Sequence, residues 1–265
     1  MQGSCNPIRP IHMPSPKLDT EETATAPQSE RAQLRLRELV VGGGIKPGLR
    51  ITELALVERL GMSRTPIRAA LVRLQEEGLL EALPGGGFTV REFSHADICD
   101  AIELRGTLEG LAARMAAERG ADAALAREAQ DCVQQLDEVL APPQLSAAAF
   151  SRYVKLNGQL HGLLAQMSGS QLVQRQIERA CMLPFASPSS FVMVHTTGTR
   201  ARDRLVIAHE QHHAVLDAVA RREGSRAEAL MREHARNAQV NLADALQNQR
   251  TLQRVRGAGL IRRPT

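Results

Sequence analysis

The chain of 265 residues has no tryptophan, one tyrosine and five phenylalanines, so aromatic residues make up only 2% of it. Strands are normally rich in aromatic and β-branched residues, whereas the alanine, leucine, arginine, glutamate and glutamine that dominate this sequence favour helices. The composition therefore predicts a mainly α-helical protein. At this length there is room for two domains, each with a core of its own.

Two further features are scarce. The four cysteines are scattered and form no Cys-x-x-Cys pair, and no apolar run reaches 18 residues. Scattered cysteines are typical of reduced thiols, and the lack of a signal-peptide apolar region or a long apolar run argues against secretion by that route and against a membrane span. We therefore expect a cytoplasmic protein with no membrane partner. The net charge of +4 suits a polyanionic partner but is too mild to indicate one.

The most informative segment that is present is GMSRTPIRAAL, residues 61–71. Gly61 supplies the positive φ that ends one helix. Ser63 can cap the next helix by accepting a backbone N–H, and Pro66 then falls in the first turn, where its missing N–H costs nothing. This layout is typical of the turn and second helix of a helix-turn-helix.

Three polar side chains crowd the start of that second helix. Arg64, Thr65 and Arg68 lie where helix-turn-helix proteins place the groups that contact phosphates and base edges. An ordinary capped surface helix has no need for two arginines and a threonine on one edge, so DNA binding is the favoured interpretation. Arg64 and Arg68 are the candidates for base readout, and Ser63 and Thr65 are the candidates for phosphate contacts.

The flanking residues complete a winged helix-turn-helix. The expected elements are helices at 30–41 and 51–60, the second helix of the motif up to about residue 78, and strands at 79–82 and 87–90. A turn at Pro84–Gly86 joins the strands as a β-hairpin. Gly86 and Gly87 should let this wing approach the DNA backbone closely.

The motifs PG-x(4)-E, LGMSRTPIRAAL-x-x-L-x-x-EGL and GGFTV, in residues 30–92, resemble the N-terminal domain of GntR-type bacterial transcription regulators. The resemblance implies a double-stranded DNA operator as partner. One position departs from the pattern, because Leu54 stands where relatives often have an arginine early in the second helix. That departure removes one expected DNA contact.

The chain divides into four expected parts. They are a disordered tail (1–28), the winged helix-turn-helix (29–93), a helical effector-binding and dimerisation domain (94–249) and a basic, frayed tail (250–265). Ser94 and Asp97 should form a capping box that starts the helical domain. Its helices are expected at 94–120, 121–140, 145–168, 169–182, 200–222 and 225–249, with 183–199 left unassigned.

Three segments of the helical part resemble the FCD ligand-sensing domain of the FadR subfamily. They are Glu103-Leu104-Arg105-x-x-Leu108-Glu109, Asn157-x-x-x-His161, and Gln211-His212 together with Met231-x-x-His234. The resemblance implies an antiparallel α-helical bundle around a cavity that often holds a divalent metal. The ligands that it implies in this chain are Asn157, His161, His212 and His234.

These positions also make chemical sense. Asn157 and His161 are four residues apart and share a helix face, while His212 and His234 lie on consecutive helices that can bring both imidazoles to one level. Three imidazoles and one oxygen suit zinc, nickel, cobalt or manganese. A single histidine is more often an ordinary polar or core residue, and only the joint pattern favours a metal site. The neutral amide of Asn157 predicts weaker metal binding or a cavity that prefers an anionic ligand.

Two further residues are candidates for effector binding. Arg105 can point into the cavity and pair with a carboxylate, or it can form a plain intrahelical pair with Glu109. Tyr153 lies one turn before Asn157 and can either line the cavity or serve packing. A small organic acid is therefore the expected effector.

One motif suggests a different class of protein. The segment HEQHH, residues 209–213, matches the H-E-x-x-H pattern of zinc metalloproteases, in which two histidines bind zinc and the glutamate is the base. Such proteases also need a third ligand and an edge strand, and this interpretation leaves residues 30–92 unexplained. We instead expect His209 and His213 to lie off the metal site, one near the cavity rim and one in solvent.

Taken together, these patterns predict a DNA-binding transcription regulator without catalytic residues, acting as a repressor. We expect it to be a homodimer that binds an inverted-repeat operator, because two-fold protein symmetry is matched by a palindromic site. The zinc metalloprotease is the alternative.

Overall fold

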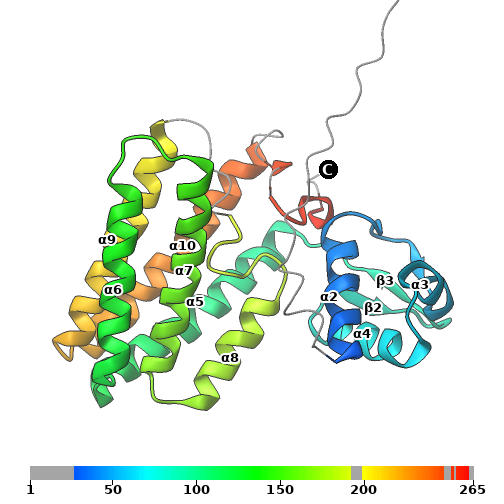
Figure 1. Cartoon of the computed structure of the whole chain (residues 1–265), viewed down its shortest axis with the longest axis horizontal. Coiled ribbons are helices and arrows are strands. Elements are labelled where there is room, and N and C mark those ends of the chain that lie inside the picture. Colours follow the sequence, from blue (N-terminus) through cyan, green and yellow to red (C-terminus); the bar gives the residue numbers. More distant parts are fainter. Residues whose placement is uncertain (1–26, 192–198, 248–251, 254, 263–265) are drawn as a thin grey trace, which may run out of the picture.

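The computed structural model describes residues 27–191, 199–247, 252, 253 and 255–262. Figure 1 shows two bodies, a small one that contains a sheet and a larger helical one. The tail expected at 1–28 lies outside the described residues up to residue 26. None of the helices among the described residues combines the length and the apolar character that a bilayer crossing requires.

The small body is a winged helix-turn-helix. Its helices are α2 (Gln28–Val41), α3 (Glu53–Leu60) and α4 (Arg64–Glu76), and its strands are β1 (Arg50–Ile51), β2 (Leu80–Ala82) and β3 (Phe88–Val90). The strand order is β1-β3-β2, and both pairings are antiparallel. The strand β1 was not expected. It occupies the first residue of the predicted helix 51–60, and Thr52 caps α3 behind it by accepting a hydrogen bond from the backbone N–H of Ala55.

The turn between α3 and α4 forms largely as expected. Gly61 ends α3 in the left-handed conformation, with φ of 63° and ψ of 31°. Pro66 is buried in the first turn of α4. Ser63 occupies the N-cap position, but its side chain makes no capping hydrogen bond, so that detail of the prediction was wrong. The exposed hydroxyl of Ser63 therefore stays available to a partner outside the chain.

Gly87 is required by the packing of the wing itself. It has a φ of 82°, and a Cβ at this position would come within 2.7 Å of the carbonyl oxygen of Ile51 on β1. A larger residue would push β1 away from β3. Gly86 has a φ of 80°, and a Cβ there would lie 3.9 Å from Nη2 of Arg50, an ordinary contact, so only its backbone conformation favours glycine.

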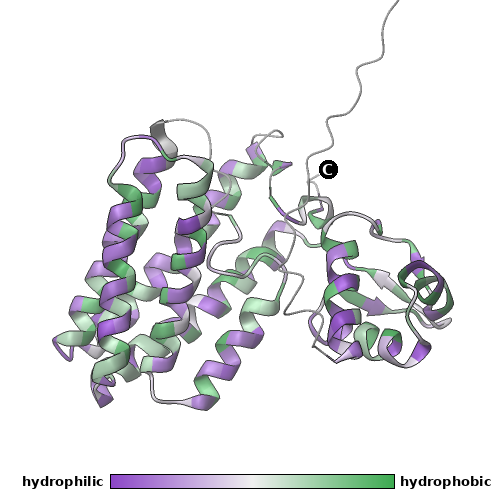
Figure 2. Cartoon of the chain, viewed as in Figure 1, coloured by the Kyte–Doolittle hydropathy of each residue, from purple (hydrophilic) through white to green (hydrophobic). Residues whose placement is uncertain are grey.

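The larger body is the expected antiparallel bundle of long helices. Its helices are α5 (His95–Arg119), α6 (Ala123–Leu140), α7 (Ala147–Met167), α8 (Gln171–Met182), α9 (Thr199–Ala220) and α10 (Gly224–Gln247). The capping box of Ser94 and Asp97 starts α5 with both of its reciprocal hydrogen bonds. Figure 2 shows hydrophilic and hydrophobic residues interleaved along each of these helices, as expected for helices that bury one face.

The tightest crossing in the bundle joins α5 to α10, which share the most extensive contact between any two elements. A Cβ on Gly106 would lie 2.6 Å from the Cβ of Ala235, and one on Gly110 would lie 2.8 Å from Cγ of Arg232. The two glycines, four residues apart on α5, therefore let α10 approach closely. This approach sets His234 of α10 beside the polar residues of α5.

The C-terminal residues that the structure describes are packed against the small body. The backbone N–H of Phe93 donates to the carbonyl of Leu260, and that of Arg262 donates to the carbonyl of Phe93, each at 2.8 Å. Leu260 and Ile261 are buried, and a 3₁₀ turn, η2 (Ala258–Leu260), contacts α2. The expectation of a frayed end is wrong for residues 255–262, because Val255, Leu260 and Ile261 are buried in the apolar cluster that includes the winged helix. Figure 1 shows this end of the chain beside the small body.

The two bodies do not have fully separate cores. One apolar cluster runs from α2 and α4 of the winged helix into Ile98 and Ile102 of α5 and into Leu242 and Ala245 of α10. A second cluster fills the helical bundle alone. The winged helix is therefore packed onto the ends of α5 and α10, the same two helices that cross at Gly106 and Gly110.

Candidate nucleic-acid interface and metal centre

The start of α4 presents the residues expected to bind DNA. Ser63, Arg64, Thr65 and Arg68 are all exposed, and the last three line one open groove between α3 and α4. The side chain of Arg68 is 76% exposed, and its Nε lies 3.6 Å from an oxygen of Glu53. An ion pair this exposed contributes little, so a phosphate or a guanine can replace the Glu53 carboxylate. Leu54 of α3, which stands where relatives often have an arginine, is also exposed.

The wing carries a basic residue that sequence patterns did not reveal. Arg50 is exposed on β1, and its Nη2 donates to the carbonyl of Gly85 at 2.7 Å. Because β1 pairs with β3, Arg50 sits beside the turn that holds Gly86 and Gly87. The Pro47-Gly48-Leu49-Arg50 segment could have suggested a basic wing, but only the pairing of β1 reveals it.

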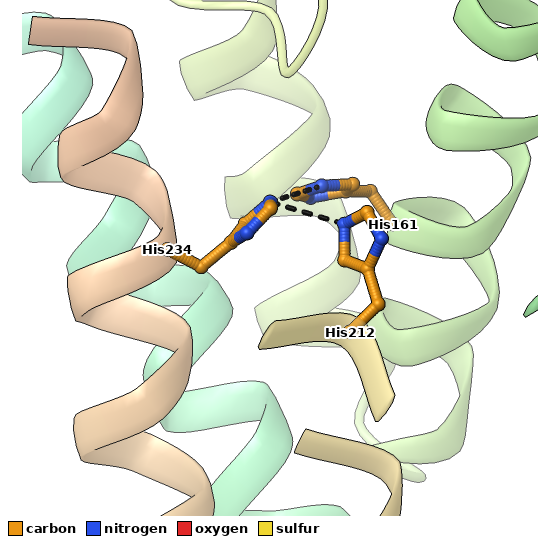
Figure 3. Close-up of side chains that lie close together, drawn as sticks. All are labelled: His161, His212 and His234. Carbon is orange, nitrogen blue, oxygen red and sulfur yellow. Dashed lines mark hydrogen bonds between the residues drawn. The ribbon is translucent and has the colours of Figure 1, made fainter. Parts of the chain in front are cut away.

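Three buried histidines meet inside the helical body. His161 comes from α7, His212 from α9 and His234 from α10, and Figure 3 shows their rings turned toward one another. Nε2 of His234 lies 3.1 Å from Nε2 of His212 and 3.3 Å from Nε2 of His161. These three side chains, called the inner site below, are the three histidines that the sequence predicted as ligands.

The spacing of the inner site fits a transition-metal ion. A zinc–nitrogen bond of 2.0–2.1 Å in a tetrahedral site places neighbouring ligand nitrogens about 3.3 Å apart. Burial and the neighbouring imidazoles lower the pKa of His212 well below its ordinary value, and they lower the pKa of His234 to about 3. Both rings are therefore neutral near pH 7, which is the form that binds a metal.

The far nitrogens of two of these rings are held by acceptors. Nδ1 of His161 donates to Oε1 of Glu109 at 2.8 Å, and Nδ1 of His234 donates to Oε1 of Gln211 at 3.2 Å. Because each ring carries its proton on Nδ1, its Nε2 keeps a lone pair directed into the inner site. Neither Glu109 nor Gln211 was predicted in this role, although both lie within the segments that carry the FCD resemblance.

Glu109 is the buried charge at this centre. Burial raises its pKa, but the Arg105 guanidinium and the hydrogen bond from His161 outweigh that effect and bring the pKa to about 2. Its second oxygen pairs with Nη1 of Arg105. The intrahelical pair that the sequence offered as one alternative for Arg105 is therefore present.

Arg105 also reaches the cavity that the other alternative requires. A cavity of about 280 Å³ is lined by Arg105, Tyr153, Asn157 and His234, together with residues of α9 and α10. Arg105 is 1% exposed, and its Nε has no hydrogen-bond partner within the described residues. Leaving a buried donor unsatisfied costs free energy, so this atom is suited to an acceptor on a bound molecule.

Asn157 lies one turn from His161 on α7 and is buried. Its amide nitrogen donates to Oγ of Ser189 at 3.2 Å, which leaves the amide oxygen for another partner. Its assignment as a fourth ligand stays a prediction, and so do the effector contacts of Arg105 and Tyr153.

The HEQHH segment lies on α9, but not as expected. His209 is buried rather than at the cavity rim, and His213 is partly exposed. Both rings contact Asp137 of α6, a residue that no sequence pattern had indicated. The protease interpretation also needs an edge strand, and the strands found among the described residues all lie between residues 50 and 90.

Comparisons with known proteins agree with this architecture. A family profile described as "FCD domain" matches residues 100–237, and one described as "Bacterial regulatory proteins, gntR family" matches residues 28–90. The HTH-type transcriptional repressor RspR of Escherichia coli K12 is 24% identical over 226 residues, covering 82% of this chain and 90% of RspR.

A second relative is more similar over a shorter stretch. An HTH-type transcriptional regulator of the TAR-I ttuE-ttuC' intergenic region of Agrobacterium vitis is 34% identical over 106 residues, which is 40% of this chain and 62% of that protein. The match thus spans less than two thirds of that relative. Among solved structures, E. coli McbR/YncC superposes with a TM-score of 0.57 at 21% identity, covering 84% of this chain and 99% of McbR.

Proposed function

This chain belongs to the GntR family of bacterial transcription regulators and carries an FCD domain, and we propose that it represses transcription under the control of a small organic acid. As a family member it is a DNA-binding regulator, and the family consists of regulators rather than enzymes. The metalloprotease alternative is therefore set aside. Repression accords with RspR, whose name describes a repressor.

The DNA contacts that we propose follow from exposure and charge. Arg64 and Arg68 read base edges in the major groove, where arginine prefers the O6 and N7 of guanine, while Ser63 and Thr65 bind phosphates. Gly86 and Gly87 bring the wing close to the DNA backbone, and Arg50 adds a phosphate contact there. The single observation that carries this assignment is the open edge at the start of α4, on which Ser63, Arg64, Thr65 and Arg68 are all exposed.

The inner site and its cavity form the proposed sensor. His161, His212 and His234, with Asn157 as the fourth ligand, would hold zinc, nickel, manganese or cobalt. Such an ion supplies positive charge and open coordination positions for a carboxylate. Arg105 offers its unpaired Nε to the same anion, and Tyr153 lines the cavity wall.

The shared core supports communication between the sensor and DNA. His234 lies on α10 two to three turns before Leu242 and Ala245, which pack into the core of the winged helix. Arg105 lies one to two turns after Ile98 and Ile102 of α5, which pack into the same core. A ligand that shifts α5 against α10 therefore changes the surface on which the winged helix packs.

We also propose that the protein is a homodimer that binds an inverted repeat in the cytoplasm. Two copies related by a two-fold axis match the two halves of such an operator. Light scattering at micromolar concentration tests this proposal, and a stable monomer both with and without operator DNA would refute it.

The central experiment selects an operator from random DNA and compares variants on it. Arg68→Ala should lose about 1–3 kcal/mol of specific binding, the cost of one bidentate base contact. Arg152→Ala, which removes an exposed arginine of α7, is the matched control and should bind as the wild type does. If Arg68→Ala selects the same operator with unchanged affinity, the assignment of base readout is wrong.

A second pair of variants tests the sensor. His161→Ala and His234→Ala should each lose metal from the inner site and blunt the response to the effector. They should leave operator binding by the metal-free protein intact, because the DNA-contacting residues lie on the other body. Full metal occupancy in both variants would overturn the proposed ligand set.

A further inference from the structure

We propose that Asp137, His209 and His213 form a second site for a divalent first-row transition metal, called the outer site below, and that it competes with the inner site. The outer ligands are a different set from those of the sensor, whereas the competition rests on the proposed metal centre at the inner site. It also gives the HEQHH segment a role that DNA binding and the inner site leave unexplained.

The geometry of the outer site is compact. His209 and His213 lie four residues apart on α9 and present their rings to the same side, with ring centroids 4.8 Å apart. Nε2 of His209 lies 2.9 Å, and Nε2 of His213 lies 3.0 Å, from the same oxygen, Oδ1 of Asp137 on α6. One ligand atom from each residue thus lies within 4.8 Å of the other two, as in the inner site.

The chemistry of the three groups points to a transition metal. Two imidazoles and one carboxylate are ligands that suit zinc, nickel, cobalt or iron, whereas calcium and magnesium prefer oxygen alone. About half of the Asp137 side chain and 37% of the His213 side chain are exposed. An ion can therefore enter from solvent and keep water in its remaining coordination positions.

The two sites touch through one hydrogen bond. Nδ1 of His209 lies 3.3 Å from Nδ1 of His212, which is a member of the inner site. A neutral imidazole carries a single proton, so only one of these two nitrogens can donate in this contact. Whichever ring donates has its Nε2 free for a metal, and the other ring has its proton on Nε2.

The hydrogen bonds of the structure favour the inner site. His209 donates from Nε2 to Asp137, so its Nδ1 accepts from Nδ1 of His212. His212 then keeps a bare Nε2 that faces His234. The inner site is therefore prepared for an ion while His209 is not.

Binding at the outer site requires the opposite arrangement. His209 must free its Nε2 for the ion and move its proton to Nδ1, where it donates to His212. His212 then carries its proton on Nε2, the atom that the inner site needs bare. With ions at both sites, two N–H groups face each other across 3.3 Å, so the second ion binds more weakly than the first.

The test is a titration of the metal-free, full-length protein with Zn²⁺, followed by calorimetry and by elemental analysis of the loaded protein. The wild type should bind a first ion tightly and a second ion more weakly. His213→Ala and Asp137→Asn should lose the second step and keep the first. Because both side chains are substantially exposed, neither change should disturb folding. Glu138→Gln, a neighbouring exposed carboxylate on α6, should titrate as the wild type does.

The competition has its own readout. His234→Ala disables the inner site and should still bind one ion at the outer site, about tenfold or more tightly than the second ion of the wild type, because His212 is then free to hold its proton on Nε2. Adding His213→Ala to this variant should abolish binding. His161→Ala replaces His234→Ala if circular dichroism shows that the latter is unfolded.

Two results would overturn the proposal. Wild-type titration curves for His213→Ala and Asp137→Asn would show that these side chains hold no ion. A second wild-type step as tight as the outer ion of His234→Ala would show that the sites do not compete through the His209–His212 hydrogen bond.

Discussion

Replacing Glu109 by glutamine removes a negative charge from the centre of the helical body with almost no change in side-chain size. Glu109 is buried between Arg105, which pairs with one of its oxygens, and His161, which donates to the other. The substitution leaves the Arg105 guanidinium buried without a counter-ion. It therefore tests whether this carboxylate stabilises the fold and orients His161.

The expected cost can be worked out in two ways. The pKa of Glu109 is about 2, against an ordinary value of 4.5, and that difference corresponds to roughly 3 kcal/mol of stability near neutral pH. Removing one partner of a buried ion pair costs about 3–5 kcal/mol in general. Both estimates predict a loss large enough to measure by urea unfolding.

The matched control is Glu118→Gln, on the same helix, where the carboxylate is exposed and pairs with Arg114 only at 3.9 Å. This exposed pair should contribute less than about 1 kcal/mol. Unfolding of the metal-free proteins at pH 7 should therefore separate the two variants clearly. Equal losses for Glu109→Gln and Glu118→Gln would refute the reasoning.

The pH dependence of the loss provides a second check. A carboxylate whose pKa is depressed in the folded state contributes stability that is fully present above pH 4.5 and is lost as the pH falls toward 2. The gap between wild type and Glu109→Gln should therefore narrow between pH 4.5 and pH 3. The same variant should weaken Zn²⁺ binding at the inner site by about 10–100-fold, because His161 loses the partner that fixes its tautomer.

Three other predictions follow from single observations. Gly106→Ala should destabilise the protein by about 1–3 kcal/mol, because its Cβ would lie 2.6 Å from that of Ala235. Gly158→Ala, in an open position on α7, should instead stabilise it by about 0.5–1 kcal/mol. Chemical denaturation measures both changes, and a reversed order would contradict the tight α5–α10 crossing. Burial lowers the folded-state pKa of His212 and brings that of His234 to about 3. The stability of the metal-free protein should therefore fall as the pH drops below 6.5, by up to about 1.4 kcal/mol per pH unit for each ring. If the slope of stability against pH is unchanged in His234→Ala, these histidines are not its cause. Gly87→Ala should force a Cβ against the carbonyl of Ile51, displace β1 from β3 and weaken operator binding in gel-shift assays. Gly85→Ala, where a Cβ would meet no other atom within 4 Å, should bind the operator as the wild type does. Equal affinities of the two variants would show that the wing tolerates a Cβ at Gly87.

Local signals in the sequence were sufficient for most of the fold. Gly61 ends α3 and Pro66 lies in the first turn of α4, as their backbone preferences predict, and Ser94 with Asp97 starts α5. The strand β1 was missed because a two-residue strand has no periodicity of its own. It exists only through its pairing with Phe88 and Thr89, more than 35 residues later.

Contacts between distant segments account for the other errors. The C-terminal residues were expected to fray because arginines dominate their composition, yet Leu260 and Ile261 are buried against the winged helix. Likewise, Gly106 and Gly110 carry no local sign of the close approach of α10. Such packing depends on how the bodies meet, which no single segment encodes.

The histidines of α9 show how far spacing alone can carry an interpretation. An i to i+4 spacing correctly predicts that His209 and His213 face the same way, but it leaves open what they face. That partner is Asp137, some 70 residues earlier on α6, and the rotation of α6 about its own axis decides the contact. His212, between them in sequence, points to the inner site, and its Nδ1 contacts that of His209. The five-residue run HEQHH therefore contributes to two clusters of potential ligands, and the two histidines of the protease pattern within it both belong to the outer site.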